Sequence, residues 1–372
     1  MSNRIFLYIF TFLLFAACSS DDDNFNIDDD QQQGEQGDGG NDDDVDDTDE
    51  NDDDIPEESS NIDIDRNSLA TNGCQNVIIV NNFAYAACGD GIEVVSLESL
   101  ERNFIDLSAD DITADAGLEL LFTQSGNDLR MLDISNPIAP TEIERINTNF
   151  GIFSGISAAN GILVVSAGTG GSDTQVYTYT STSLNLVNNG IASVDAVTGN
   201  PDVHLAESAN GAVAFYSQDI GAVENWGIQI VEFDEAGAVI AIPPVVVLTP
   251  RRFTGNFGIP FGPANLPVES EFLNNTLYVA HFAAPGIHTI DLLNGNTLGL
   301  IPLDYEPTNV STDGSLLFVV GVTETRVDII DPLDNSIVDQ IEAELELAIG
   351  VAASDTHIAI ADRSDGLIII TR

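Results

Sequence analysis

The feature that most constrains this fold is a recurring trio of short apolar runs separated by turn residues. A first run ends in an Asn, Gly or Asp turn, a second follows that turn directly, and a third begins a few residues later. The third runs start near Gly91, Asp128, Thr174, Gly227, Gly286, Thr325 and Gly366. The trio occurs seven times, at a mean spacing of about 46 residues, which is typical of a repeat protein.

These runs are interpreted as strands, because each is short and either alternates apolar and polar residues or is apolar throughout. Each repeat leaves room for a fourth, weaker strand, such as Pro244–Leu248. Repeats of four strands and roughly 40 to 50 residues are typical of blades that close radially. The sequence therefore predicts an all-β fold, a seven-bladed β-propeller over residues 61–372.

One segment, Ser336–Ala352, carries two periodicities. Ile341, Leu345 and Ile349 have helical spacing, whereas residues 341–347 alternate apolar and acidic side chains strictly. Because the segment falls within the repeat of strands, we expect it to be a strand and not a helix.

The seventh copy reaches Arg372 after only three strands, which leaves one sheet edge without a partner. Asn61–Leu69 begins with alternating apolar and acidic residues. We expect this segment to supply the missing strand and close the propeller from the other end of the chain.

The charge distribution separates the propeller from a linker. The chain has 61 acidic and 10 basic residues, all of the latter arginine, for a formal charge of −51. Residues 21–60 hold 20 of the acids and no arginine, so this stretch is expected to stay solvated and disordered. A protein that binds nucleic acid or an anionic membrane surface needs a basic face, so both are excluded as binding partners.

A targeting signal is predicted ahead of the linker. Arg4 precedes an apolar stretch over residues 5–15, which is long enough for a signal peptide and too short to cross a bilayer. The stretch ends in Phe15-Ala16-Ala17-Cys18, which resembles a bacterial lipobox, although lipoboxes usually have an aliphatic residue where Phe15 stands. The alternative is an ordinary cleaved signal peptide.

This resemblance implies a signal peptide over residues 1–17 and an anchor in which Cys18 carries outer-membrane lipid. The following Ser19-Ser20-Asp21-Asp22-Asp23 resembles the signal that sends Bacteroidota lipoproteins to the outer face of the outer membrane. Residues 18–60 would then be an acidic spacer that holds the propeller away from the membrane and toward the cell exterior.

The repeats also resemble known propeller families. Leu277-Tyr278-Val279-Ala280 and the pattern of residues 306–319 resemble the YVTN repeat of seven-bladed propellers. Asp133-Ile134-Ser135-Asn136-Pro137 is similar to the LVIVD repeat of secreted and surface proteins. The resemblance implies the fold and leaves the chemistry open, because propellers host many functions.

Two cysteines remain inside the propeller. Cys74 and Cys88 lie at either end of a predicted hairpin, and an exported protein can keep a disulfide between them. A two-residue turn would place position 75, not 74, opposite 88, so two unpaired cysteines are the alternative.

The search for catalytic or metal-binding motifs finds none. The four histidines, His204, His281, His288 and His357, lack the spacing of a zinc site, and no nucleophile elbow or phosphate loop is present. The aspartate runs of the linker lack the alternating ligands and turn glycine of a calcium loop. The sequence therefore predicts no cofactor and no metal, with a loosely bound divalent cation such as calcium as the alternative.

Two longer connections depart from the repeat and are expected on the same face of the propeller. Ser217–Trp226 ends in the only tryptophan, Trp226, and Thr249–Pro267 contains the only adjacent cations of the chain. The candidate ligand-binding residues are Arg251, Arg252, Phe253, Phe257, Phe261 and Trp226. Paired guanidinium groups beside aromatic rings suit a carboxylate, an acidic sugar or a partner protein. The alternative is a loop that plugs the channel.

These observations favour a monomeric, surface-tethered binding or interaction module for a glycan, an acidic ligand or a protein partner. The alternative is an exported enzyme such as a metal-dependent hydrolase or lactonase, since propellers also support such activities.

Overall fold

The computed structural model describes residues 62–147, 153–167, 175–189, 202–208, 211–220, 225–241, 246–250, 268–281, 285–291 and 296–372. Every regular element in them is a β-strand, as the sequence predicted. In this part of the chain no helix has the length and apolar character needed to cross a bilayer. The predictions for residues 1–17 and 18–60, including Cys18, lie outside the described residues.

The strands form antiparallel sheets in which neighbours along the chain pair with one another. The first two sheets contain β2 (Asn76–Val80), β3 (Phe83–Ala87), β4 (Ile92–Ser96) and β5 (Arg102–Ile105), then β6 (Asp111–Asp115), β7 (Leu120–Ser125), β8 (Asp128–Asp133) and β9 (Thr141–Asn147). The third contains β10 (Phe153–Ala159), β11 (Ile162–Ala167), β12 (Gln175–Thr180) and β13 (Ser183–Asn189).

The next three sheets repeat this order. They contain β14 (Asp202–Ser208), β15 (Gly211–Ile220), β16 (Asn225–Phe233), β17 (Val239–Ala241) and β18 (Val246–Pro250); β19 (Val268–Leu273), β20 (Thr276–His281), β21 (Ile287–Asp291) and β22 (Asn296–Ile301); and β23 (Pro307–Thr312), β24 (Leu317–Gly321), β25 (Arg326–Asp331) and β26 (Ser336–Glu342). The sheet that begins with β14 has five strands, because β18 also pairs with β16.

The last sheet joins the two ends of the described chain. It contains β27 (Ala348–Ala353), β28 (His357–Asp362), β29 (Gly366–Thr371) and β1 (Asp63–Asp65). β1 is antiparallel to β29, with Ile64 opposite Ile370. Gly73, which follows this segment, has a φ of 69°, and a Cβ there would lie 1.9 Å from the carbonyl oxygen of Arg363. Only glycine therefore allows the chain to pass so close to the last sheet.

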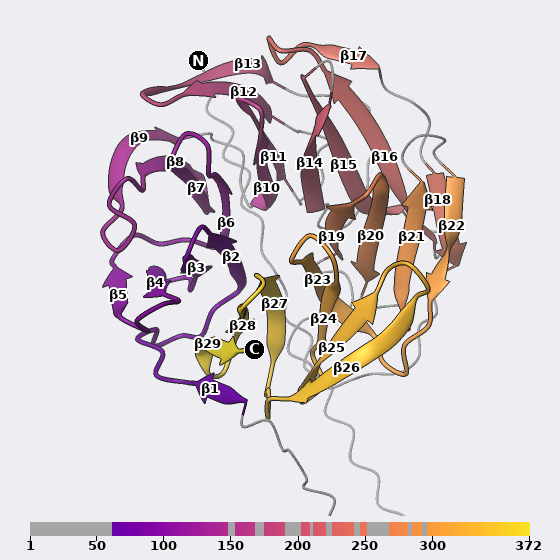
Figure 1. The fold of residues 1–372 in the computed structure, drawn as a ribbon. Coiled ribbons are helices and arrows are strands. Elements are labelled where there is room, and N and C mark those ends of the chain that lie inside the picture. The colour runs from indigo at the N-terminus through magenta and orange to yellow at the C-terminus, as the bar shows by residue number, and fades with distance from the viewer. Residues whose placement is uncertain are drawn as a thin grey trace, which may run out of the picture. The chain divides into compact units, whose positions relative to one another are not determined.

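The first strand of each sheet contacts the first strand of the next, through β2, β6, β10, β14, β19, β23 and β27, and β27 contacts β2 in turn. Figure 1 shows these strands facing a common centre. Radial packing of antiparallel sheets around a centre is the arrangement of a β-propeller.

The first hairpin of several sheets turns through asparagine and glycine in the left-handed conformation. Asn160 and Gly161 have φ values of 52° and 77°, and Asn274 and Asn275 have values of 51° and 65°. Two consecutive positive φ values define the tight turn that suits the twist of a hairpin, and Asn and Gly accept them at least cost. These turns explain why the strands begin and end close to where the apolar runs of the sequence begin and end.

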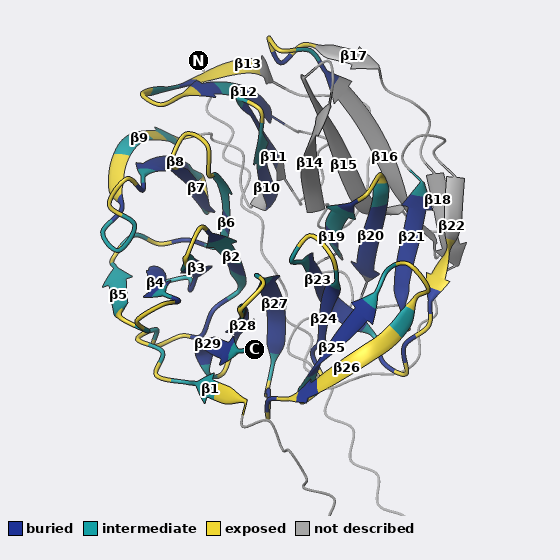
Figure 2. Cartoon of the chain, in the orientation of Figure 1, coloured by how far each residue is buried: buried dark blue, intermediate teal, exposed yellow. Residues whose placement is uncertain are grey.

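Burial is greatest on the second and third strands and least on the outermost ones (Figure 2). β24 and β29 are almost wholly buried, whereas most of β26 is exposed. β24 and β29 are buried along nearly their whole length, which fits their nearly continuous apolar sequences.

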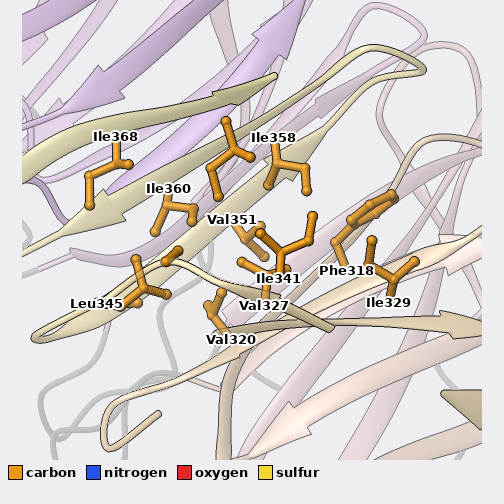
Figure 3. Packing of buried hydrophobic residues seen from close by; sticks show 13 residues of the cluster. Phe318, Val320, Val327, Ile329, Ile341, Leu345, Val351, Ile358, Ile360 and Ile368 are labelled. Carbon is orange, nitrogen blue, oxygen red and sulfur yellow. The ribbon is translucent and has the colours of Figure 1, made fainter. Parts of the chain in front are cut away.

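The core lies between adjacent sheets. One cluster joins β23–β26 to the last sheet, with Phe318 and Val320 packed against Ile358 and Ile360 (Figure 3). Ile64 of β1 packs against this cluster and thereby fixes the closing strand.

The prediction for residues 341–347 is wrong in one respect. β26 ends at Glu342, and residues 343–347 form neither strand nor helix. Ala343 and Leu345 are nonetheless buried and Glu344 and Glu346 exposed. Glu344 has a φ of 45°, and the N–H groups of Ala343 and Leu345 both donate to the carbonyl oxygen of Thr325, so the segment is an irregular connection on the core that periodicity alone misassigned.

The prediction that the whole of Ser217–Trp226 connects two strands is also wrong for its ends. β15 continues to Ile220 and β16 begins at Asn225, so a long hairpin replaces much of the loop. Asp219 lies opposite Trp226, which in turn lies opposite Thr249 of β18.

Candidate functional site

The ligand-binding residues predicted from the sequence cannot be placed together. Arg251, Arg252, Phe253, Phe257 and Phe261 lie outside the described residues. Trp226 is placed by its backbone in β16, and its side chain is outside the described part of the chain.

The two propeller cysteines are joined: Cys74 and Cys88 form a disulfide, and both are buried. In the β2–β3 hairpin Asn76 lies opposite Ala87, so the same register would place position 75 opposite Cys88. The disulfide starts from position 74 and therefore crosses between the two chain segments diagonally. The backbone N–H of Cys74 donates to the carbonyl oxygen of Asp362 at 2.9 Å. The disulfide therefore lies where the first sheet meets the last.

The carboxylate of Glu93 approaches both sulfur atoms, with all three potential ligand atoms within 4.8 Å of one another. A metal needs thiolate sulfur, which a disulfide does not offer. Among the described residues no other group of three such side chains is this close, so none of them forms a compact metal site.

A cavity of about 300 Å³ lies along the first strands of six sheets. Its lining includes polar side chains from five of these strands, among them Asn76, Asp111, Ser157, Glu271, Asn309 and Ser311. A volume near the lower end of the roughly 300–1,000 Å³ usual for ligand pockets suits a small molecule. This cavity is the candidate functional site.

Asp111 is held firmly at the wall of the cavity. Its Oδ1 accepts hydrogen bonds from the side-chain amide of Asn76 and from the backbone N–H of Ile112, the latter at 2.8 Å. Its Oδ2 accepts from the backbone N–H of Ile156 at 3.0 Å. One carboxyl group thus links the first strands of three consecutive sheets. Burial nevertheless raises the pKa of Asp111 to about 6, because desolvation outweighs these hydrogen bonds.

The other carboxyl groups of the lining come from β19. Glu269 and Glu271 both line the cavity, and Glu271 Oε1 accepts a hydrogen bond from the backbone N–H of Phe272 at 2.8 Å. Burial raises the pKa of Glu271 to about 7. Glu271 therefore lies where a negative charge is poorly solvated.

β23 contributes polar groups with unused hydrogen-bonding capacity. Asn309 is 5% exposed and Ser311 is 9% exposed, and both line the cavity. Neither side chain makes a hydrogen bond to any part of the chain that the structure describes. Because buried amides and hydroxyls normally have partners, these two groups are suited to meet a ligand or water.

The titratable groups in the described lining of the cavity are all acidic. Its described lining contains three carboxyl groups, Asp111, Glu269 and Glu271, and no arginine or histidine. His288, a candidate in the sequence search, lies buried on β21 and outside this lining, and burial lowers its pKa to about 4.

This site was not predicted from the sequence, because the chain has so many acidic residues that those of the cavity do not stand out. The available signal was position: Asp111 and Glu271 fall at or inside first runs, which a propeller places around its axis. A polar residue in such a run faces neither bulk solvent nor a fully apolar core.

Comparison with known proteins supports the fold. Residues 123–148 match the model of the LVIVD repeat, and this range includes the motif at residues 133–137. A comparison with curated proteins finds no match.

Two solved structures are similar along most of the chain. One is described as Kuenenia stuttgartiensis hydrazine synthase, with a TM-score of 0.61 and 14% identity over 81% of this chain and 96% of that one. The other, from the mitotic checkpoint complex, has a TM-score of 0.58 and 12% identity over 80% and 87% of the two chains. At such identities the likeness shows the architecture alone. The chain is thus similar in fold to propeller-type proteins and carries an LVIVD repeat in a β-propeller scaffold.

Proposed function

We propose that this chain is a binding module that holds a small polar ligand in the central cavity of its propeller. The observation that carries the proposal is the polar wall of that cavity, above all the buried side chains of Asn309 and Ser311, which have no partner among the described residues. A wall of this kind costs stability unless a ligand or water meets its polar groups.

We further propose that the sheets are the seven blades of one propeller. Six four-stranded sheets and one five-stranded sheet, with first strands in mutual contact from β2 round to β27, support this number. Pairing of β1 with β29 supports closure by the N-terminal strand.

The module is proposed to be tethered to the outer face of the outer membrane through lipid on Cys18. The lipobox-like sequence and the acidic stretch over residues 21–60 support this proposal. Mass spectrometry of the N-terminal peptide from native membranes tests it, because a diacylglyceryl group on Cys18 is expected. An unmodified N-terminus beyond residue 18 would contradict the anchor.

The loop with Arg251 and Arg252 stays a second proposed site, for an acidic sugar or a protein partner. Its support is chemical, because two adjacent guanidinium groups attract anions.

One observation favours the alternative of an exported hydrolase. The carboxyl groups of Asp111 and Glu271 have raised pKa values, as general acids often do. Hydrolysis of ester, lactone or glycoside substrates by the purified protein, abolished in Glu271→Gln, would support this alternative over simple binding.

The binding proposal is tested by occluding the cavity. We expect a library of sugars, amines and small acids to contain a compound that raises the melting temperature of the purified protein. Ser311→Leu and Thr113→Leu should remove that increase, because both side chains line the cavity. Ser181→Leu is the matched control, since Ser181 is exposed in the β12–β13 turn. Equal stabilisation of the occluded variants would refute binding in the cavity.

A further inference from the structure

The polar wall of the cavity has two tiers, and the register of the hairpins shows which residues share a tier. In four sheets an aromatic residue of the second strand lies opposite a first-strand residue that lines the cavity. These pairs are Ile78 with Tyr85, Thr113 with Phe122, Glu271 with Tyr278, and Ser311 with Phe318. Residues two positions earlier lie on the same face of each strand, so the other tier contains Asn76, Asp111, Glu269 and Asn309.

The acidic members of both tiers are already engaged within the chain. Asp111 accepts hydrogen bonds from the side chain of Asn76 and from two backbone N–H groups. Glu271 accepts one from the backbone N–H of Phe272, and both Glu269 and Glu271 interact with other groups as well. These carboxyl groups therefore need no charged ligand to complete their contacts.

β23 differs, because its members of the two tiers are neutral and have no partner in the chain that the structure describes. Asn309 is 5% exposed and Ser311 is 9% exposed. By contrast, the hydroxyl oxygen of Thr308, on the same strand and outside the described lining, lies 3.2 and 3.0 Å from two backbone carbonyl oxygens. A buried amide and a buried hydroxyl without partners cost stability unless a ligand or water meets them. Asn309 and Ser311 thus suit binding better than folding.

The spacing of these two residues sets the reach of the ligand. Positions i and i+2 lie about 6.6 Å apart along a strand. One ligand that contacts both side chains therefore needs hydrogen-bonding groups at two separate edges. The amide of Asn309 and the hydroxyl of Ser311 can each donate and accept, as hydroxyl groups on a ligand also do. Hydroxyl groups on opposite sides of a single sugar ring meet these requirements in a cavity of about 300 Å³.

The neighbouring part of the wall is apolar. β27 contacts both β23 and β2, and Val351 and Ala352 of β27 and Ile78 of β2 line the cavity. The C–H groups of a sugar ring can pack against such side chains while its hydroxyl groups face β23. An ionic group at the same place would exchange its water for neutral partners, which costs free energy.

We infer that the central cavity binds a neutral, hydroxyl-rich ligand of the size of one hexose, and that Asn309 and Ser311 hold its hydroxyl groups. The inference rests on the proposed binding function and narrows its ligand class.

Isothermal titration calorimetry of the purified protein tests the ligand class. Glucose, galactose and mannose vary the directions of the hydroxyl groups, and the amino sugar and uronic acid of each add a positive or a negative charge at similar size. We expect at least one neutral hexose to bind, and both of its charged relatives to bind at least about tenfold more weakly, because their ionic groups lose water without compensation.

Two variants test the residues. Asn309→Leu and Ser311→Ala should each weaken binding of that hexose at least about tenfold, since a ligand hydroxyl group then loses its partner. Neither should lower the melting temperature of the ligand-free protein, because each removes a buried polar group that has no partner in the described chain. Thr308→Val is the matched control, and it should lower the melting temperature and leave the affinity unchanged.

The outcomes separate the inference from the function on which it rests. Tighter binding of an amino sugar or a uronic acid that Thr113→Leu abolishes would overturn the neutral ligand and leave the binding module intact. Hexose binding that neither Asn309→Leu nor Ser311→Ala weakens would overturn the location. A fall in the melting temperature of these two variants as large as that of Thr308→Val would show that the side chains serve folding. If none of the three neutral hexoses binds, the inference fails, and the binding module stands only if another compound raises the melting temperature and Thr113→Leu removes that increase.

Discussion

The guanidinium group of Arg102 lies 2.6 Å from the carboxylate of Glu93, and both side chains are buried. The same guanidinium group lies 2.9 Å from Asp65 on β1. Glu93 also accepts hydrogen bonds from the Ser68 hydroxyl and from the backbone N–H of Leu69 at 3.0 Å. One buried ion pair on the first sheet therefore holds the segment that closes the last sheet.

Removal of this cation should destabilise the fold strongly. We expect Arg102→Ala to lower the free energy of unfolding by about 3–5 kcal/mol, because Glu93 would be left as an uncompensated buried charge. Urea denaturation measures the change. Arg145→Ala is the matched control, since Arg145 pairs with Asp128 at a largely exposed position and should matter little. An equal effect of the two substitutions would contradict the clamp.

Deletion of residues 61–69 should lower the melting temperature. Without β1, the edge of β29 loses its ladder partner and Arg102 loses Asp65. Calorimetry of the shortened chain measures the loss. Deletion of a similar length from the acidic stretch 21–60 serves as the control and should leave the transition in place. An unchanged melting temperature after deletion of 61–69 would show that closure does not depend on this strand.

Loss of the disulfide should cost about 3 kcal/mol of stability on the chain-entropy model, given its separation of 14 residues. Cys74→Ala/Cys88→Ala and reduction by dithiothreitol should have similar effects on the urea midpoint. Thiol titration of the unfolded, unreduced propeller should find no free thiol from these two residues. Two titratable thiols would mean that the cysteines are unpaired in the isolated protein.

Stability should fall as pH rises from about 4.5 to about 7. Burial raises the pKa of Glu271 from 4.5 to about 7, so the folded protein holds this proton more tightly than the unfolded chain does. Deprotonation above pH 4.5 therefore favours unfolding. Deprotonation of Asp111 lowers stability in the same way between pH 3.8 and about pH 6.

Lowered pKa values act in the opposite direction and at lower pH. Burial by itself would raise the pKa of Asp65, but the hydrogen bonds from Arg102 and Asn67, together with the positive charge of Arg102, outweigh burial and lower it. This carboxylate stabilises the fold above about pH 4 and stops doing so in stronger acid.

The contribution of Glu271 can be isolated by comparing melting temperatures at pH 4.5 and pH 7. Glu271→Gln should reduce the pH dependence, and Glu101→Gln should not. Mutual repulsion of the many surface carboxylates also weakens the fold at higher pH, but salt screens that effect far more than it screens a buried group. A slope that Glu271→Gln leaves unchanged would rule out this residue as its source.

Arg251→Ala/Arg252→Ala should abolish binding of acidic glycans or acidic surface proteins on arrays while leaving the melting temperature unchanged. The expected reason is loss of bidentate contacts to carboxylate or sulfate groups. A Lys pair at the same positions is a useful comparison, because it keeps the charge and loses the planar geometry. Unaltered array binding by the alanine variant would eliminate the proposed site.

The strands and turns were predictable because their signals are local. Asn160-Gly161 and Asn274-Asn275 adopt the left-handed turns that their residue types favour, and the apolar runs beside them are the strands. Residues 341–347 were not predictable in the same way. Whether alternating residues find a ladder partner depends on another part of the chain, and Ala343 and Leu345 pack without one.

The cavity could not be predicted from the sequence, because its contacts cross between repeats. The hydrogen bond from Ile156 to Asp111 spans 45 residues, and no local pattern distinguishes Asp111 from the other acids. The buried ion pair of Arg102 and Glu93 was missed for the same reason. Its third member, Asp65, lies on β1, which pairs with β29 in the last sheet and not with the strands that carry Arg102 and Glu93.

The position of β1 also decides how the protein responds to mechanical load. A pull on the chain ahead of residue 62 reaches the propeller first at β1 and then at the segment that Glu93 clamps. If both give way, the force acts on Cys74 and is carried by the disulfide to Cys88, so it bypasses the hairpin of β2 and β3. The hairpin that supplies Asn76 to the cavity is thus shielded from force, and the cavity can persist while the closing strand detaches.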